Sequence, residues 1–192
     1  MALLNQGDHM VASADIYGGT YGLLTEEFPR FGISTTMADM RDPASYEAAI
    51  QENTKLLYIE TLTNPVLKVC DIEAMADVAK RHNLLLLIDN TFASPWGCKP
   101  LDMGVDLVLH STTKYLGGHS DILGGAVVGS KDLIAQIFMR KVHFGAAPDP
   151  HSCYLLERGM RTLDVRMPRI CDNAHNLAVR LENHPAIERV YH

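Results

Sequence analysis

Lys114 is the first residue of chemical interest, because three hydroxyl residues, Ser111, Thr112 and Thr113, directly precede it. Hydroxyl donors beside an amine suit an anionic group such as a phosphate, and a lysine amine also condenses with aldehydes. A glycine pair follows the lysine at 117–118, whereas a nucleotide-binding P-loop has its glycines before the lysine. This order excludes a P-loop and leaves two interpretations, a reactive lysine beside an anion site and a solvated surface lysine.

A second residue of this kind is Asp89, which directly follows the apolar run 84–88. A carboxylate at the end of a buried run either caps a turn or faces a cationic partner, such as a protonated ring nitrogen. An amine for imine formation, a carboxylate for a ring nitrogen and hydroxyls for a phosphate together match pyridoxal 5'-phosphate. Tyr17, followed by Gly18 and Gly19, is the candidate for an aromatic face over that ring; a partly buried tyrosine before a turn is the alternative.

Short apolar runs that alternate with amphipathic segments must position these residues. Apolar residues at 72, 75, 76 and 79 share one helix face, and Asp71 is the expected N-cap of that helix. Strands alternating with helices predict an α/β fold with a mostly parallel sheet, which binds ligands at the carboxyl ends of its strands. Strands are expected over 55–59, 84–88, 106–110 and 124–129, with weaker candidates at 9–13 and 33–36, and further helices over 20–28, 131–142, 151–158 and 168–183.

Composition excludes several other classes of protein. The 192 residues carry a net charge of −6, and no cluster of Lys and Arg indicates a nucleic-acid partner. The longest apolar run, 84–88, is far shorter than the roughly 20 residues of a membrane-spanning helix, and the N-terminus does not resemble a signal peptide. Four dispersed cysteines and no metal-ligand spacing among the histidines favour a cytoplasmic protein with free thiols and no metal.

Several separated blocks of the sequence resemble one family over nearly the whole chain. This family is the trans-sulfuration group of pyridoxal-phosphate enzymes in cysteine and methionine metabolism. The sequence around Lys114 is most similar to that of cystathionine γ-synthase and γ-lyase. The blocks are Tyr17–Thr20, Glu60–Pro65, Leu87–Thr91, His110–Asp121, Arg158–Leu163 and Arg166–Met167. Gly19 is a departure, because methionine γ-lyases often have Cys at the matching position.

The resemblance implies an aspartate-aminotransferase-like large domain of fold type I. It implies that Lys114 holds the internal aldimine and later moves protons, that Asp89 pairs with the pyridine nitrogen, and that Tyr17 stacks on the ring. Three further contacts are implied: Asn64 approaches the phenolic oxygen, and Ser111 and Thr113 donate to the phosphate. A structural role is expected for the other polar residues of these motifs, Asn90, Thr91, His119 and Asp121.

The activity implied by the resemblance is elimination or replacement at Cβ or Cγ, with cleavage or formation of C–S bonds. The expected substrates are small amino acids such as cystathionine, methionine or O-acyl-homoserine, and the alternative is a truncated cofactor-binding domain without turnover. Residues 1–185 are then a large domain truncated at its N-terminal side, and 186–192, with a strand expected at 187–191, begin a missing C-terminal domain. Family analogy also predicts a homotetramer, a dimer of dimers, with no membrane or nucleic-acid partner.

Overall fold

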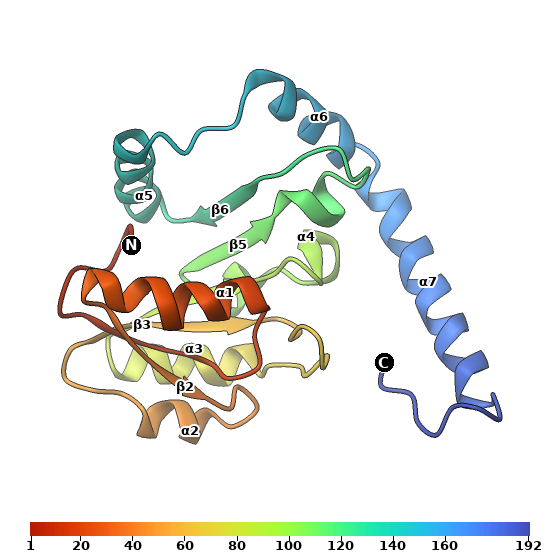
Figure 1. The fold of residues 1–192 in the computed structure, drawn as a ribbon, viewed down its shortest axis with the longest axis horizontal. Helices are drawn as coiled ribbons and strands as arrows, with labels where there is room; N and C mark the ends of the chain where they lie inside the picture. Colours follow the sequence, from red (N-terminus) through yellow and green to blue (C-terminus); the bar gives the residue numbers. More distant parts are fainter.

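A six-stranded sheet forms the centre of the computed structural model, which describes all residues from 1 to 192 (Figure 1). The strand order is β2-β1-β3-β4-β5-β6, and every neighbouring pair is parallel except β5 and β6. The predicted mostly parallel sheet is therefore confirmed. The strands are β1 (His9–Ser13), β2 (Ser34–Ala38), β3 (Thr54–Glu60), β4 (Leu85–Asp89), β5 (Leu107–Ser111) and β6 (Gly125–Gly129).

Helices connect the parallel strands and continue beyond the sheet. Asp71 caps α3 as predicted, since its carboxylate accepts a hydrogen bond from Ala74 N at 3.0 Å. The helix expected over 20–28 is instead a short α-helix that continues as a π-turn, Leu23–Glu27, and a 3-10 turn, Phe28–Phe31. The α-helices are α1 (Gly18–Gly22), α2 (Pro43–Ala48), α3 (Ile72–Arg81), α4 (Ser94–Gly97), α5 (Lys131–Phe144), α6 (Pro150–Met160) and α7 (Leu163–Glu182).

The sheet buries an apolar layer on each face because successive side chains of a strand point to opposite sides. On one face, Leu57 and Ile59 of β3 pack in a cluster with residues of α2 and α3 such as Tyr46 and Met75. On the other face, Leu56 and Tyr58 of the same strand pack with the segment that follows β1, including Leu24 and Phe28 of the two turns after α1. These layers bury β1 and β3 at the centre of the sheet, whereas the edge strands β2 and β6 are partly exposed.

The last three helices lie largely outside these two cores. Figure 1 shows α7 running away from the sheet, and it begins at Leu163 instead of 168, with Pro168 inside it. Buried Met167, 2% exposed, anchors this first part of the helix. The strand expected at 187–191 does not form, because no other strand lies beside this segment to pair with it. The proposed domain boundary after 185 stays a prediction.

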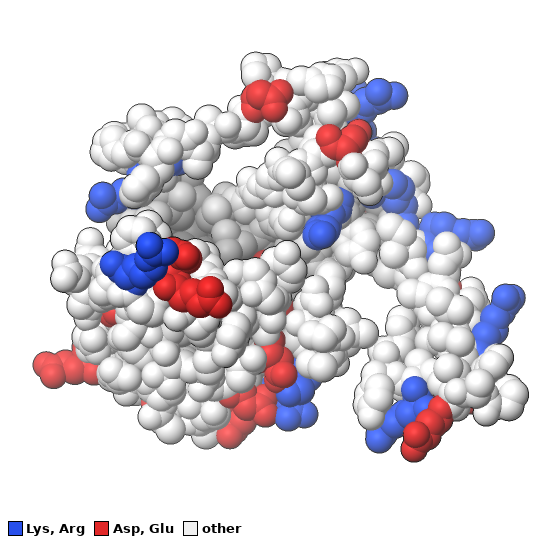
Figure 2. Space-filling model, in the orientation of Figure 1, with Lys and Arg blue, Asp and Glu red and all other residues white.

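None of the helices has both the length and the apolar composition that crossing a membrane requires. On the face drawn in Figure 2, acidic and basic side chains both occur on the part of the molecule that holds the sheet, and single basic side chains with a few acidic ones occur along α6 and α7. This face has no continuous basic surface.

Candidate active site

One cavity of about 380 Å³ lies at the carboxyl ends of β3, β4 and β5. All six residues predicted from the sequence line it, so the structure brings together side chains that are as many as 97 positions apart, the difference between 17 and 114. They are Tyr17, Asn64, Asp89, Ser111, Thr113 and Lys114, and the wall is completed by Glu60, Leu62, Thr91, Phe92 and Leu123. Their functional roles remain predictions at this point.

Asp89 is the last residue of β4, and one of its carboxylate oxygens is held in place by Thr91. Oδ1 accepts hydrogen bonds from the backbone N of Thr91 at 2.9 Å and from its Oγ1 at 2.5 Å. Thr91 Oγ1 in turn accepts from the backbone N of Ser111 at 2.8 Å, which joins the ends of β4 and β5. Oδ2 is left as the oxygen that Thr91 does not engage.

Lys114 follows β5 in a turn, Thr112–Leu116, whose backbone is interrupted at the lysine itself. Its φ of −98° and ψ of −124° are not helical, and such single π-type turns frequently occur at functional sites. The neighbours Thr112 and Leu116 are buried, at 3% and 7% exposed, whereas the lysine side chain is exposed to the cavity. The turn is therefore anchored on both sides of an accessible amine.

The two hydroxyl residues of the predicted phosphate site differ in their surroundings. Ser111 lines the cavity as the last residue of β5. Thr113 Oγ1 accepts a hydrogen bond from Gly124 N at 3.1 Å and lies 3.4 Å from Gly124 O. Thr113 thus also holds the loop before β6 against the lysine turn.

Sequence reasoning missed Glu60, which connects the two loops that carry Tyr17 and Asn64. Its Oε1 accepts from Tyr17 N at 2.9 Å, and its Oε2 accepts from Asn64 N at 3.2 Å. Burial raises the pKa of this carboxyl, which is 4% exposed, and the two backbone donors partly oppose that effect. Glu60 directly follows a buried apolar run, as Asp89 does, and the two are register partners, so the same sequence pattern marks both.

Tyr17 has a ring that lies against its own chain at Gly19. A Cβ added to Gly19 would come within 2.6 Å of Tyr17 Cε1, whereas one added to Gly18 would meet nothing within 4 Å. Tyr17 is 53% exposed and lines the cavity. The absence of a side chain at 19 is therefore what allows this position of the ring.

The polar motif residues given a structural role lie mostly outside the cavity. Asn90 is fully buried, accepts from Thr61 Oγ1 at 2.7 Å and donates to Cys98 O at 2.9 Å. His119 Nδ1 lies 2.9 Å from Gly117 O, and Asp121 lines a neighbouring cavity of about 1030 Å³ that shares Lys114. Thr91 is the exception, since it contacts Asp89 directly and lines the site. No group of three or more His, Cys, Asp or Glu side chains is placed to hold a metal ion.

The donor set of the cavity fits pyridoxal phosphate. An amine, a carboxylate oriented through one oxygen, a hydroxyl at a strand end and an exposed aromatic ring line one space, and its volume is in the range of small-ligand sites. A parallel α/β sheet with this set at its carboxyl edge defines a pyridoxal-phosphate class of site.

The chain belongs to the Cys/Met metabolism PLP-dependent enzyme family, whose model matches residues 1–192. Enzymes of this family use pyridoxal 5'-phosphate, and the structure has their type I fold. It is similar to the crystal structure of cystathionine γ-lyase from Lactobacillus plantarum complexed with L-serine. The TM-score is 0.96 at 46% identity, over 99% of this chain and 50% of that one.

Curated relatives carry several activities. Cystathionine γ-lyase of Bacillus subtilis (strain 168) is 48% identical over 100% of this chain and 51% of its own length. L-methionine γ-lyase of Porphyromonas gingivalis (strain ATCC BAA-308 / W83) is 45% identical over 96% and 47%, and a probable cystathionine γ-synthase of Herpetosiphon aurantiacus is 44% identical over 99% and 60%. The chain spans about half the length of most of these relatives.

Proposed function

We propose that this cavity binds pyridoxal phosphate through Lys114 and serves elimination or replacement at Cβ or Cγ of small sulfur-containing or activated amino acids. One observation carries the proposal: the amine of Lys114 and the carboxylate of Asp89 line the same cavity of about 380 Å³. Lys114 is also the only amine-bearing side chain in its wall.

The bound cofactor supplies an aldehyde that condenses with amines and a protonated ring that accepts electrons from the substrate Cα. Asp89 holds the proton on the ring nitrogen, because Thr91 fixes Oδ1 and thereby orients the carboxylate. In this proposal Tyr17 packs on the cofactor ring, and Asn64 donates a hydrogen bond to the phenolic oxygen of the cofactor. Ser111 and Thr113 donate to the phosphate.

Proton transfer in this proposal falls to Lys114. With its Nζ free of the cofactor, Lys114 would take the proton from the substrate Cα as a general base. A leaving group at Cβ departs after this single deprotonation. A leaving group at Cγ would require a second deprotonation at Cβ, so Lys114 would first give the Cα proton to the bound cofactor and its amine would then take the proton from Cβ. Its exposure toward the cavity allows one amine to serve successive positions.

The names of the similar proteins support the substrate class. Cystathionine γ-lyase and L-methionine γ-lyase act on amino acids with sulfur at Cγ, and the similar solved structure holds L-serine. Because γ-lyases and a probable γ-synthase match at nearly the same identity, cystathionine, methionine and O-acyl-homoserine are all proposed substrates.

The cofactor assignment is tested with Lys114→Ala. The protein loaded with pyridoxal phosphate is expected to show a visible absorption band that the variant lacks. Lys99→Ala is the matched control, because Lys99 lies outside the cavity wall. A band of unchanged intensity in Lys114→Ala would refute the assignment.

The activity is tested by incubating the loaded protein with cystathionine, methionine and O-acetylhomoserine and identifying the products. Turnover of any of them that disappears in Lys114→Ala supports the proposal. Cofactor binding with turnover of none of the three substrates supports the alternative, a cofactor-binding chain without activity. The half-length match to relatives is the observation that favours this alternative.

Two further properties belong to this proposal. A homo-oligomer is supported by α5, which buries none of its residues and exposes Phe138, Met139, Val142 and Phe144. Sedimentation equilibrium of the loaded protein tests it, and a monomer at micromolar concentration would contradict it. The proposed cytoplasmic location is supported by the four cysteines, which are all free thiols.

A further inference from the structure

The block Arg158–Met167, which resembles the family but lies outside the cavity of the cofactor site, packs against the turn that carries Lys114. Gly159, near the end of α6, is buried with its Cα against the carbonyl of Gly117, and a Cβ added there would collide with Gly117 O. A Cβ added to Gly117 would come within 2.7 Å of Thr112 O. The junction of α6 and α7 therefore approaches the lysine turn backbone to backbone.

Arg166, the fourth residue of α7, bridges this contact. Its Nη2 donates to Gly159 O at 2.9 Å, and its Nε donates to Thr162 Oγ1 at 3.0 Å. The guanidinium lies directly over Gly118, since a Cβ added there would collide with Arg166 Cζ and Nη1 and come within 2.7 Å of Nη2. One side chain thus joins the end of α6, the start of α7 and the lysine turn.

Gly118 is connected to the lysine itself. Its backbone N donates to the carbonyl of Lys114 at 2.7 Å, and its φ of +79° is a conformation that suits glycine. The hydrogen bond closes the turn directly after a lysine whose own φ and ψ are not helical. The guanidinium therefore covers a glycine whose backbone is hydrogen-bonded to Lys114, which connects Arg166 to the lysine turn.

We propose that Arg166 is a positioning residue that holds the Lys114 turn in its reactive geometry through Gly118, with Gly159 as the complementary surface. The proposal rests on the proposed function, in which Lys114 reacts with the cofactor. Arginine suits this role because its rigid planar group can donate to two acceptors and cover a backbone at once, which a lysine cannot do. A substrate contact is the competing role, since Arg166 also lines the neighbouring cavity of about 1030 Å³.

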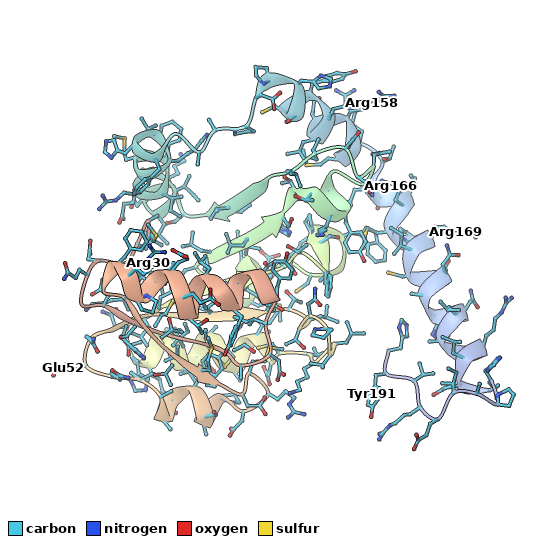
Figure 3. All side chains as sticks on the ribbon, viewed as in Figure 1. Arg30, Glu52, Arg158, Arg166, Arg169 and Tyr191 are labelled. Carbon is cyan, nitrogen blue, oxygen red and sulfur yellow. The ribbon has the colours of Figure 1, made fainter.

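The test follows the attachment of pyridoxal phosphate to Lys114 in Arg166→Ala, Arg166→Lys and Arg169→Ala. Figure 3 shows Arg166 where α7 begins and Arg169 further along the same helix with its side chain projecting away from the body, so Arg169→Ala is a charge-matched control. Growth of the visible band gives the attachment rate, and borohydride reduction followed by peptide mass mapping identifies the modified lysine. Because a misplaced reacting group costs up to about 100-fold, we expect the rate to fall about tenfold in Arg166→Ala and about threefold in Arg166→Lys. Arg169→Ala should stay within about twofold of the wild type.

A double-mutant cycle tests the route through Gly118. Gly118→Ala alone places a Cβ on the guanidinium, and removing Arg166 relieves that collision, so the two effects on the attachment rate should be non-additive by at least about threefold. If Arg166 only stabilised the fold, its removal would lower the unfolding midpoint, leave the attachment rate unchanged and show no coupling to Gly118→Ala in that rate. Additive effects would overturn the role of Gly118.

The outcomes separate this inference from the function on which it rests. Absence of a pyridoxyl group on Lys114 in the reduced wild-type protein overturns the proposed function itself. Labelled wild type together with wild-type attachment in Arg166→Ala overturns the positioning role alone. A raised KM at unchanged attachment rate and kcat would assign Arg166 to substrate binding and would also overturn it.

Discussion

The hydroxyl of Thr91 lies 2.5 Å from Oδ1 of Asp89, the carboxylate proposed to face the cofactor ring. The same hydroxyl accepts the backbone N–H of Ser111 at 2.8 Å. The threonine therefore does two things at once, because it orients the carboxylate at the end of β4 and fixes the end of β5 beside it. The lysine turn starts at the next residue after Ser111, so Thr91, together with the pairing of β4 and β5, fixes how Asp89 and Lys114 are placed relative to each other.

Thr91→Val is expected to weaken cofactor binding. Valine removes the hydrogen bond from the hydroxyl to Asp89 and keeps the one from the backbone N–H. It also leaves the N–H of Ser111 without its acceptor, a loss of about 1–3 kcal/mol for a buried donor. A loss of 1.4 kcal/mol corresponds to a tenfold change in Kd, so we expect Kd to rise by about that factor. Fluorescence titration with pyridoxal phosphate measures it. Thr91→Ser keeps the hydroxyl and should restore most of the affinity; equal affinities of the valine variant and wild type would refute the role.

Glu60→Gln is expected to loosen both loops that Glu60 joins. A glutamine has one carbonyl oxygen and an NH₂ group, so one of the two backbone N–H donors, of Tyr17 or Asn64, loses its acceptor. Hydrogen exchange of the amide that loses its acceptor should speed up by about tenfold or more, from the same loss of about 1–3 kcal/mol. Glu52→Gln, whose side chain is exposed at the edge of the molecule, is the control (Figure 3). Unchanged protection of both amides would contradict the connecting role.

Gly19→Ala is expected to displace the ring of Tyr17. The added methyl would come within 2.6 Å of Cε1, so the ring must rotate away from its present position. A rotamer strain of about 1 kcal/mol predicts a rise of about fivefold in the Kd for pyridoxal phosphate. Gly18→Ala meets no neighbouring atom within 4 Å and is the matched control for helix propensity. Equal affinities of the two variants would show that Tyr17 does not depend on Gly19.

Acid is expected to destabilise the protein through His9. This residue is 1% exposed and lies 2.8 Å from Thr54 Oγ1 and 2.9 Å from Thr36 Oγ1, and burial lowers its pKa from the ordinary 6.5. As the pH is lowered, the unfolded chain therefore binds the proton first. The free energy of unfolding has its full value above pH 6.5 and decreases as the pH drops under 6.5.

The slope that His9 contributes is at most about 1.4 kcal/mol per pH unit, and buried His110, whose pKa burial also lowers, contributes with the same sign. Urea unfolding between pH 7.5 and 5.5, a range of about two units around the histidine pKa, measures the slope. His9→Gln should make it shallower, whereas exposed His143→Gln should not change it. An unchanged slope in His9→Gln would exclude this residue as the source.

The sequence by itself determined the elements of the sheet and the six proposed site residues. Apolar runs such as 84–88 and the helical period of 72, 75, 76 and 79 are local properties, and they predict the six strands and the helix after Asp71 to within one or two residues. The start of α7 lies five residues before the expected position 168. Because the carboxyl ends of parallel strands meet at one edge, the polar residues that follow them converge there. This is why Asp89 and Lys114 were identifiable before any contact was known.

Only the tertiary structure decided how those residues are held. Glu60 had the same sequence pattern as Asp89, yet its two partners are the backbone amides of two separate loops, which side-chain spacing does not reveal. The contact of Arg166 with Gly118 joins segments 48 positions apart, the difference between 118 and 166. The unformed strand at 187–191 has the same explanation, because strands depend on partners elsewhere in the chain and local sequence encodes only the tendency to pair.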